Sequence, residues 1–248
     1  RARRGLGLGG GPHRVGLRHL RGPDDLRDPP SAEALEVLAI VGDVRNDDDI
    51  TEAVMKTQGE FGGIDIVVNN ASVLSLAGSL DLDAKRYDLM QDVNVRGTFM
   101  LSRAAIPILR EAENPHILSL SPPLNITPKW LGAHTGYTLA KFGMSMVTLG
   151  MAAEFAKDGI AANTLWPATT IQTAAIANTP MGAKMMAVSR TPEIYADAAY
   201  AVITQPASSY TGHSLIVEEV LIAAGVTDFE KYSPGVSPEL LLRDIFLD

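Results

Sequence analysis

Short apolar runs that alternate with long helical patterns constrain the fold of this chain most strongly. Three runs have the character of buried strands, at residues Ile64–Asn69, His116–Leu120 and Ile160–Leu165. Runs this short, with few charges, are typical of a parallel sheet that is covered by helices on both faces. Alternation of such strands with helices predicts an α/β fold with a doubly wound parallel sheet.

Helical periodicity predicts the segments that cover this sheet. Residues Asp47–Phe61 form an amphipathic pattern that turns three side chains inward, Ile50, Val54 and Met55. A long helical region with a kink spans Asp83–Glu113. Two further strands and one further helix complete the expected order, at Val37–Val41, His213–Val217 and Glu193–Thr204.

A tyrosine and a lysine separated by three residues carry the strongest chemical signal. Helical periodicity continues from Lys141 to Gly159, so Tyr137 and Lys141 lie one turn apart on one helix face. A nearby ammonium lowers the pKa of a tyrosine, whose ordinary value is about 10. Such a tyrosine can donate a proton to a carbonyl oxygen or remove one from an alcohol. The alternative is a solvated helix face on which the two residues fall by chance.

Composition limits the remaining functional classes. The 248 residues suffice for one large domain, and the absence of cysteine excludes disulfides and thiolate chemistry. No apolar run is long enough for a transmembrane helix, and the net charge of -8 argues against nonspecific binding of nucleic acid. We therefore expect no membrane and no nucleic-acid partner, and a cytoplasmic location.

Residues 1–30 differ in composition from the rest of the chain. They are rich in Arg, Gly and Pro, with seven Arg and three Asp. Gly5, Gly7 and Gly10 match a dinucleotide-binding fingerprint, but no strand precedes them and no helix follows, so we interpret the match as coincidence. A transit peptide and a basic nucleic-acid-binding tail are compositional alternatives. We predict an irregular segment, disordered or mistranslated, at residues 1–30 and one domain at residues 31–248.

The order of motifs resembles that of the short-chain dehydrogenase/reductase family. Five strings carry the resemblance over about residues 36 to 248, namely NNAS, DVNVRGTF, HILSLSPPLN, YTLAKFGMSM and NTLWP. The resemblance implies a Rossmann-type fold and an oxidoreductase that interconverts an alcohol and a carbonyl with NAD or NADP. Compared with the family, the chain is expected to lack the first βαβ unit, which carries the glycine-rich phosphate loop.

The resemblance assigns four catalytic roles. Tyr137 is the acid and base, Lys141 lowers its pKa and holds the cofactor's ribose, and Asn94 holds a relay water. Ser121 orients the substrate carbonyl, although it stands one place earlier than the family's serine, and Ser119 is the alternative. Because Tyr137 and Ser121 together polarise the carbonyl oxygen, we expect no metal.

The resemblance also implies cofactor contacts from six residues besides Lys141. They follow three of the predicted strands, at Val37–Val41, Ile64–Asn69 and Ile160–Leu165. They correspond to the adenine side, the floor and the nicotinamide end of the site: Asp43 and Val44, Asn70 and Ala71, Pro167 and Thr170. Thr169 and Thr173 are alternatives to Thr170. A helix N-cap is the alternative reading of Asp43, and a plain turn is that of Asn70 and Ala71.

The substrate is expected to be a small apolar alcohol or ketone, because segment 170–192 is rich in small residues and Met and suits a lid over an apolar ligand. By resemblance, the long helices imply a homo-oligomer. Two other classes stay open. One is an inactive dehydrogenase-like chain that cannot bind NAD(P) because the phosphate loop is absent, and the other is an interaction protein that uses the sheet as a scaffold.

Overall fold

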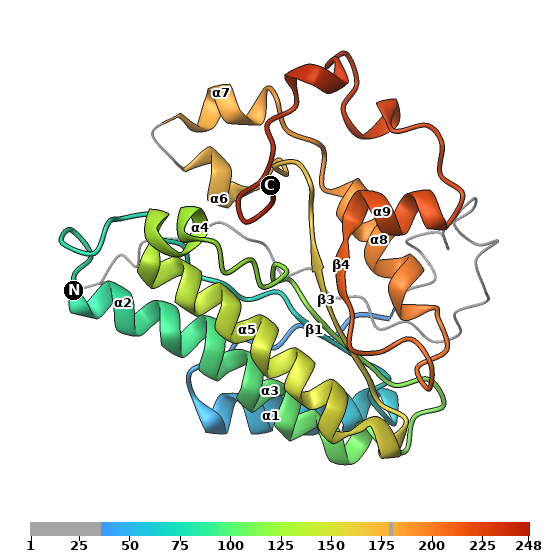
Figure 1. Cartoon of the computed structure of the whole chain (residues 1–248). Coiled ribbons are helices and arrows are strands. Elements are labelled where there is room, and N and C mark those ends of the chain that lie inside the picture. The colour runs from blue at the N-terminus through green and yellow to red at the C-terminus, as the bar shows by residue number, and fades with distance from the viewer. Residues whose placement is uncertain (1–35, 179–180) are drawn as a thin grey trace, which may run out of the picture.

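A sheet of four parallel strands lies at the centre of the molecule (Figure 1). The computed structural model describes residues 36–178 and 181–248. The strands pair in chain order and are β1 (Ile66–Asn69), β2 (His116–Ser119), β3 (Ala161–Trp166) and β4 (Ser214–Ile216). The α/β fold with a parallel sheet is confirmed. The predictions for residues 1–30 lie outside the described residues, so the absence of a first βαβ unit stays a prediction.

Helices cover both faces of this sheet (Figure 1). One face carries α1 (Asp47–Phe61), α3 (Gly97–Leu109) and α5 (Thr135–Glu154), and the other carries α8 (Glu193–Ile203) and α9 (Val217–Ala223). Shorter helices complete the chain, namely α2 (Ala84–Met90), α4 (Pro128–Ala133), α6 (Ala174–Ala177) and α7 (Gly182–Met186). None of the helices in the described residues has both the length and the apolarity needed to cross a bilayer.

Neighbouring side chains of one strand serve two separate cores. Ile117 packs with Ala105 of α3 and Met151 of α5, whereas Leu118 packs with residues of α8 and α9 such as Ile194. Side chains alternate across a strand, so both neighbours can be buried only where helices cover both faces. Every side chain of β2 and of β3 is buried, and these two strands therefore form the centre of the sheet.

Helix α1 has the predicted limits. The Asn46 side chain accepts a hydrogen bond from the Asp48 N–H at the start, and Gly62 ends the helix in the left-handed conformation with φ 79°. The prediction that Met55 faces inward is wrong, because its side chain is exposed. Ile50 and Val54 form a buried i, i+4 pair, and the next position turns away from their stripe.

The predicted strand at Val37–Val41 is also wrong. This segment belongs to none of the four described strands, and the exposed fraction of Val41 is 103%. A strand needs a hydrogen-bonded neighbour, and the sheet of the described residues ends at β1. The segment therefore lies outside the sheet of the described residues, and within it Val37 and Val41 are exposed whereas Leu38 and Ile40 are partly buried.

Candidate active site

Helix α5 brings Tyr137 and Lys141 into the protein beside the end of β2. Both side chains are buried, and Lys141 Nζ donates a hydrogen bond of 2.9 Å to the Leu120 carbonyl. One turn further along α5, Ser145 Oγ donates to the Pro122 carbonyl at 2.6 Å. These two bonds hold α5 against the loop that follows β2, on either side of Ser121. Lys141 therefore lies beside Ser121, and the shared site of Tyr137, Lys141 and the strand-end serine stays a prediction.

The two candidate serines have different surroundings. Ser119 Oγ accepts hydrogen bonds from Asn69 Nδ2 at 3.1 Å and from Thr148 Oγ1 at 2.7 Å. Ser121 Oγ is buried and has no hydrogen-bond partner among the described residues. A buried hydroxyl without a partner costs about 1–3 kcal/mol. The geometry therefore favours Ser121 as the ligand-binding serine and gives Ser119 a structural role.

Asn94 lies where the predicted kink occurs. Residues Gln91–Arg96 form a π-helical segment between α2 and α3, a rare conformation that is frequent at functional sites. Asn94 Nδ2 donates to the Val73 carbonyl at 3.0 Å, and its Oδ1 accepts from the Val73 N–H at 2.7 Å. The side chain thus holds the loop after β1 in place, and its role with a relay water stays a prediction.

Burial changes the protonation of the catalytic pair. It raises the pKa of Tyr137 well above its ordinary value of 10.0, and the nearby carboxylate of Asp244 adds to this increase. Burial also lowers the pKa of Lys141 to about 8, an effect that Asp244 opposes. The predicted lowering of the Tyr137 pKa is wrong for this structure, because burial and the Asp244 carboxylate both disfavour the phenolate. Tyr137 is a neutral phenol here, which is the form that donates a proton.

Three of the predicted cofactor residues meet at the edge of the sheet. Val44, Asn70 and Ala71 line one hollow of about 40 Å³ beside β1. Gly97 closes this hollow, since a Cβ added to it would lie 2.9 Å from Cγ2 of Val44. Asp43 instead forms an ion pair of 2.5 Å with Arg45, which holds the pKa of the carboxyl below its ordinary value.

The threonines after β3 are already engaged. Thr170 Oγ1 lies 2.6 Å from Ser189 Oγ. Thr169 Oγ1 donates to Glu218 Oε1 at 3.1 Å, and the Thr173 side chain caps α6. Pro167 is buried directly after β3. A cofactor amide that binds here would have to share or replace one of these hydroxyl contacts, and the choice among the threonines stays open.

A nicotinamide cofactor fits one end of this site. The partnerless hydroxyl of Ser121 and the buried ammonium of Lys141 suit the carbonyl and ribose oxygens that meet at a nicotinamide. None of the described strands is followed by a glycine-rich turn into a helix, so the described residues offer no cradle for the pyrophosphate. They also contain no group of three His, Asp or Glu side chains that could hold a metal ion.

Sequence analysis missed the segment that covers the catalytic tyrosine. Phe246 is buried, with its ring centroid 6.1 Å from that of Tyr137 and the two rings stacked at 29°. Asp244 of the same segment is half-buried, and this enclosure raises its pKa to about 7. The available signal was the apolar character of the tail, which contains the triplets Leu240-Leu241-Leu242 and Ile245-Phe246-Leu247, because apolar side chains are most often buried.

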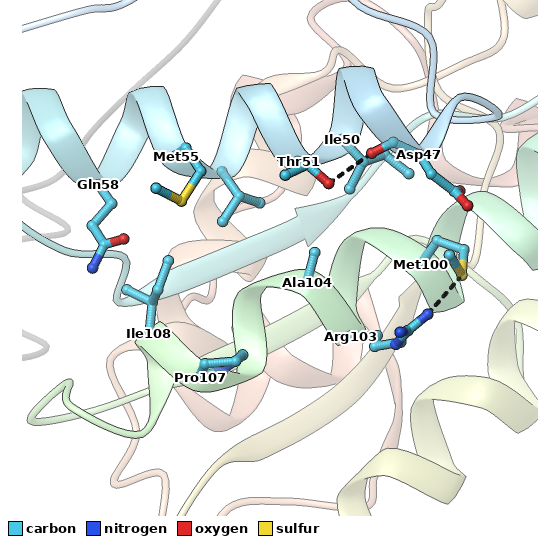
Figure 2. Close-up of a pocket in the computed structure, with 11 residues that line it drawn as sticks. Asp47, Ile50, Thr51, Met55, Gln58, Met100, Arg103, Ala104, Pro107 and Ile108 are labelled. Carbon is cyan, nitrogen blue, oxygen red and sulfur yellow. Dashed lines mark hydrogen bonds between the residues drawn. The ribbon is translucent and has the colours of Figure 1, made fainter.

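A groove larger than the hollow beside β1 lies away from these groups. Figure 2 shows this groove of about 650 Å³, which is lined by α1 and α3, with Met55, Met100 and Ile108 along it. None of the predicted site residues lines it. The chemical properties of the residues therefore identify the candidate active site better than the volume of a cavity does.

Comparison with known proteins agrees with this geometry. Residues 24–219 match the family model described as enoyl-(acyl carrier protein) reductase. The match covers well over half of the chain. The chain belongs to the short-chain dehydrogenase/reductase family. Members of this family generally use NAD(P), act on small molecules and form oligomers.

Individual relatives are between 26% and 49% identical to this chain over the residues that align. Hydroxysteroid dehydrogenase-like protein 2 is 48% identical in Danio rerio and 46% identical in Homo sapiens, in each case over 86% of this chain and 50% of the relative. The chain thus spans about half the length of these relatives. A short chain dehydrogenase from Mycobacterium thermoresistibile is 49% identical, with a TM-score of 0.77 over 84% of this chain and 73% of that chain. A variant of the Serratia marcescens short-chain dehydrogenase/reductase is 26% identical, with a TM-score of 0.64 over 75% of this chain and 77% of that chain.

Proposed function

We propose that this protein interconverts an alcohol and a carbonyl on a small apolar substrate with NAD or NADP. The buried Ser121 hydroxyl carries the proposal, because it lacks a protein partner beside the bond that Lys141 makes to Leu120. A polar group in this state is positioned for a ligand oxygen. An interaction protein would have no use for such a hydroxyl beside Tyr137 and Lys141.

Each side chain has a separate task in carbonyl reduction. Ser121 Oγ donates a hydrogen bond to the substrate carbonyl and orients it. Tyr137, a neutral phenol, donates its proton to the carbonyl oxygen. Lys141 has a pKa of about 8, so it is an ammonium below that pH and stabilises the phenolate that forms. The nicotinamide, when bound, supplies or accepts the hydride.

The proposed substrate is apolar because the surroundings of Tyr137 are. Tyr137 belongs to a buried cluster that includes Met90, Phe142 and Trp166. The name of the vertebrate relatives, hydroxysteroid dehydrogenase-like, points the same way. The lid at residues 170–192, the cytoplasmic location and the boundary at residue 30 stay predictions.

An inactive dehydrogenase-like chain is the second candidate. It is favoured by one observation, that the described residues contain no glycine-rich turn for a pyrophosphate. The two candidates differ in whether this chain binds a dinucleotide at all.

Titration with NADH and NADPH, followed by nicotinamide fluorescence, separates the two candidates. Under the proposed function one of the two binds in the micromolar range, and Tyr137→Phe reduces kcat by about 10²–10⁴-fold while leaving binding unchanged. Ser209→Ala, an exposed position away from the site, serves as the matched control. Absence of binding at millimolar concentration would establish the inactive chain instead.

The proposed homo-oligomer has a candidate surface on the helical face opposite the sheet. Phe99 of α3 and Leu139 and Met146 of α5 are exposed apolar side chains. Such side chains on two neighbouring helices favour association with a second copy. Leu139→Glu should convert the oligomer to a monomer in light scattering, whereas Met55→Glu on α1 should not. An oligomer that survives Leu139→Glu contradicts this surface.

A further inference from the structure

An aromatic cage encloses the ring of Phe246. The cage consists of Trp130, Tyr137, Phe142 and Trp166, whose ring centroids lie 5.1–6.1 Å from that of Phe246. The exposed fraction of Phe246 is 1%, and that of Tyr137 is 6%. The ring that covers the catalytic phenol is thus a side chain of the protein itself.

The segment Leu242–Asp248, which we name the closing segment, is attached along its backbone. Leu242 N–H donates to the Val188 carbonyl at 2.9 Å, and Asp244 N–H donates to the Ala168 carbonyl at 3.0 Å. Trp166 of the cage donates from Nε1 to the Ile245 carbonyl at 3.0 Å. These bonds place Phe246 over the cage from one side.

The end of the closing segment is held by polar groups on the rim of the cage. The Asp248 carboxylate accepts hydrogen bonds from Asn125 Nδ2 at 2.8 Å and from Trp130 Nε1 at 3.1 Å. Lys129 Nζ lies 3.6 Å from the same carboxylate. The side chain of Asp248 is exposed, and these contacts form a rim latch that ties the closing segment to Trp130 of the cage and to the loop beside it.

Phe246 adopts a strained backbone conformation in this position. Its φ of 71° is the one positive value at a non-glycine residue among the described residues. This region is unfavourable for a residue with a Cβ, at a cost of order 1–3 kcal/mol, and such strain clusters at ligand clamps and switch regions. The cage contacts therefore stabilise Phe246 in a backbone conformation that is unfavourable by itself. This is expected for a segment that can move out of the cage.

We propose that the aromatic cage is the subsite for a ring-bearing apolar part of the substrate, and that Phe246 occupies it when no substrate is bound. The inference rests on the proposed function, since it gives the cage its substrate. A substrate carbonyl can reach the Tyr137 hydroxyl only when the ring of Phe246 does not cover Tyr137. The four flat walls suit an aromatic or alicyclic ring system better than an open alkyl chain, because rings stack on rings. Substrate and Phe246 therefore compete for one space.

Ligand binding can be tested without cofactor or turnover. Both tryptophans of the chain, Trp130 and Trp166, belong to the cage, so intrinsic fluorescence reports on its occupant. We would titrate the full chain with decalone and with the open-chain decanone. The wild type should bind decalone more tightly. Phe246→Ala should tighten the apparent Kd for decalone by about tenfold, because it removes the internal competitor and raises the competent fraction.

Two further variants keep this test decisive. Phe229→Ala removes a ring that contacts Tyr232 outside the cage and should change the apparent Kd by less than about twofold. Asp248→Ala opens the rim latch and frees Trp130 Nε1, but it leaves all four cage side chains and the core residues unchanged, and it should tighten decalone binding by about threefold even where Phe246→Ala fails to fold. Unchanged or weaker decalone binding in both Phe246→Ala and Asp248→Ala would overturn the proposal and make Phe246 a wall of the site.

Equal binding of decalone and decanone would overturn the assignment to ring systems. Because no nicotinamide is present, a failed cofactor titration would leave each of these outcomes readable.

Discussion

The region around β3 and the edge at β1 differ in how completely the described residues cover them. Leu165 of β3 is fully buried under α8 and α9, and the closing segment covers the end of β3, although no side chain of the neighbouring edge strand β4 is buried. At β1, by contrast, the exposed fraction of Val68 is 46% although it lies in a strand between helices. The sheet is thus covered beside Tyr137 and Lys141, a region that we name the finished edge, and open on the side of the predicted dinucleotide residues.

This difference separates two kinds of site in one domain. Lys141 is positioned by its hydrogen bond to the Leu120 carbonyl, next to the partnerless Ser121 hydroxyl, and Tyr137 is buried one helical turn away. Val44 and Asn70 only border a small hollow at the open edge. Variants that act differently at the two edges therefore test whether the contrast is real.

The largest expected effect concerns the two serines at the finished edge. Ser121→Ala should lower kcat by about 10²-fold or more, because it removes the hydrogen bond to the substrate carbonyl, and should leave the free energy of unfolding unchanged or higher. Ser119→Ala should reverse this pattern, with a loss of about 1–3 kcal/mol of stability, since it breaks the bonds to Asn69 and Thr148. Steady-state kinetics and urea unfolding measure both quantities. Equal activity losses in the two variants would contradict the distinction.

The pH dependence of turnover should follow Lys141. With a pKa of about 8, the ammonium is present below that pH and is lost above it, so kcat for carbonyl reduction should fall about tenfold per pH unit on the basic side. Lys141→Arg keeps its charge throughout this range and should remove the basic limb. A basic limb that persists in Lys141→Arg would have to belong to another group.

Asp244 should make the stability of the finished edge depend on pH. Its pKa is raised from 3.8 to about 7 in the folded state, chiefly by burial, so the folded protein binds the proton more tightly than the unfolded chain does. The resulting stabilisation is present below about pH 4 and is lost as the pH rises through about 7. Asp244→Asn should therefore raise Tm at about pH 8 and have little effect at about pH 4. A uniform shift at both pH values would point to packing instead of titration.

The smallest effect should mark the open edge. Val67 and Val68 are neighbours on β1, but Val67 is buried and Val68 is half exposed. Val67→Ala should lower the free energy of unfolding by about 1–3 kcal/mol, and Val68→Ala by about 0.5 kcal/mol or less. Chemical denaturation of the two variants measures the contrast directly. Equal losses would show that β1 is covered on both faces in solution.

The sequence by itself determined the order of the fold and the spacing of its candidate catalytic pair. Apolar runs predicted β1, β2, β3 and β4 to within a few residues, because a doubly covered strand must be short and apolar. The helical spacing of Tyr137 and Lys141 placed them on one face of α5 for the same local reason. Local sequence patterns are sufficient to predict a feature when the periodicity of the strand or helix decides which side a residue faces.

Tertiary structure alone decided the protonation, the choice of serine and the role of the closing segment. The pKa of Tyr137 depends on burial among distant residues, which no spacing reveals. Ser121 differs from Ser119 because Asn69 and Thr148, far away in sequence, satisfy only the latter. Phe246 meets Tyr137 across more than one hundred residues of chain. Such contacts depend on which elements the fold brings together, and the apolar pattern at Val37–Val41 likewise could not reveal that this segment lies outside the four-stranded sheet of the described residues.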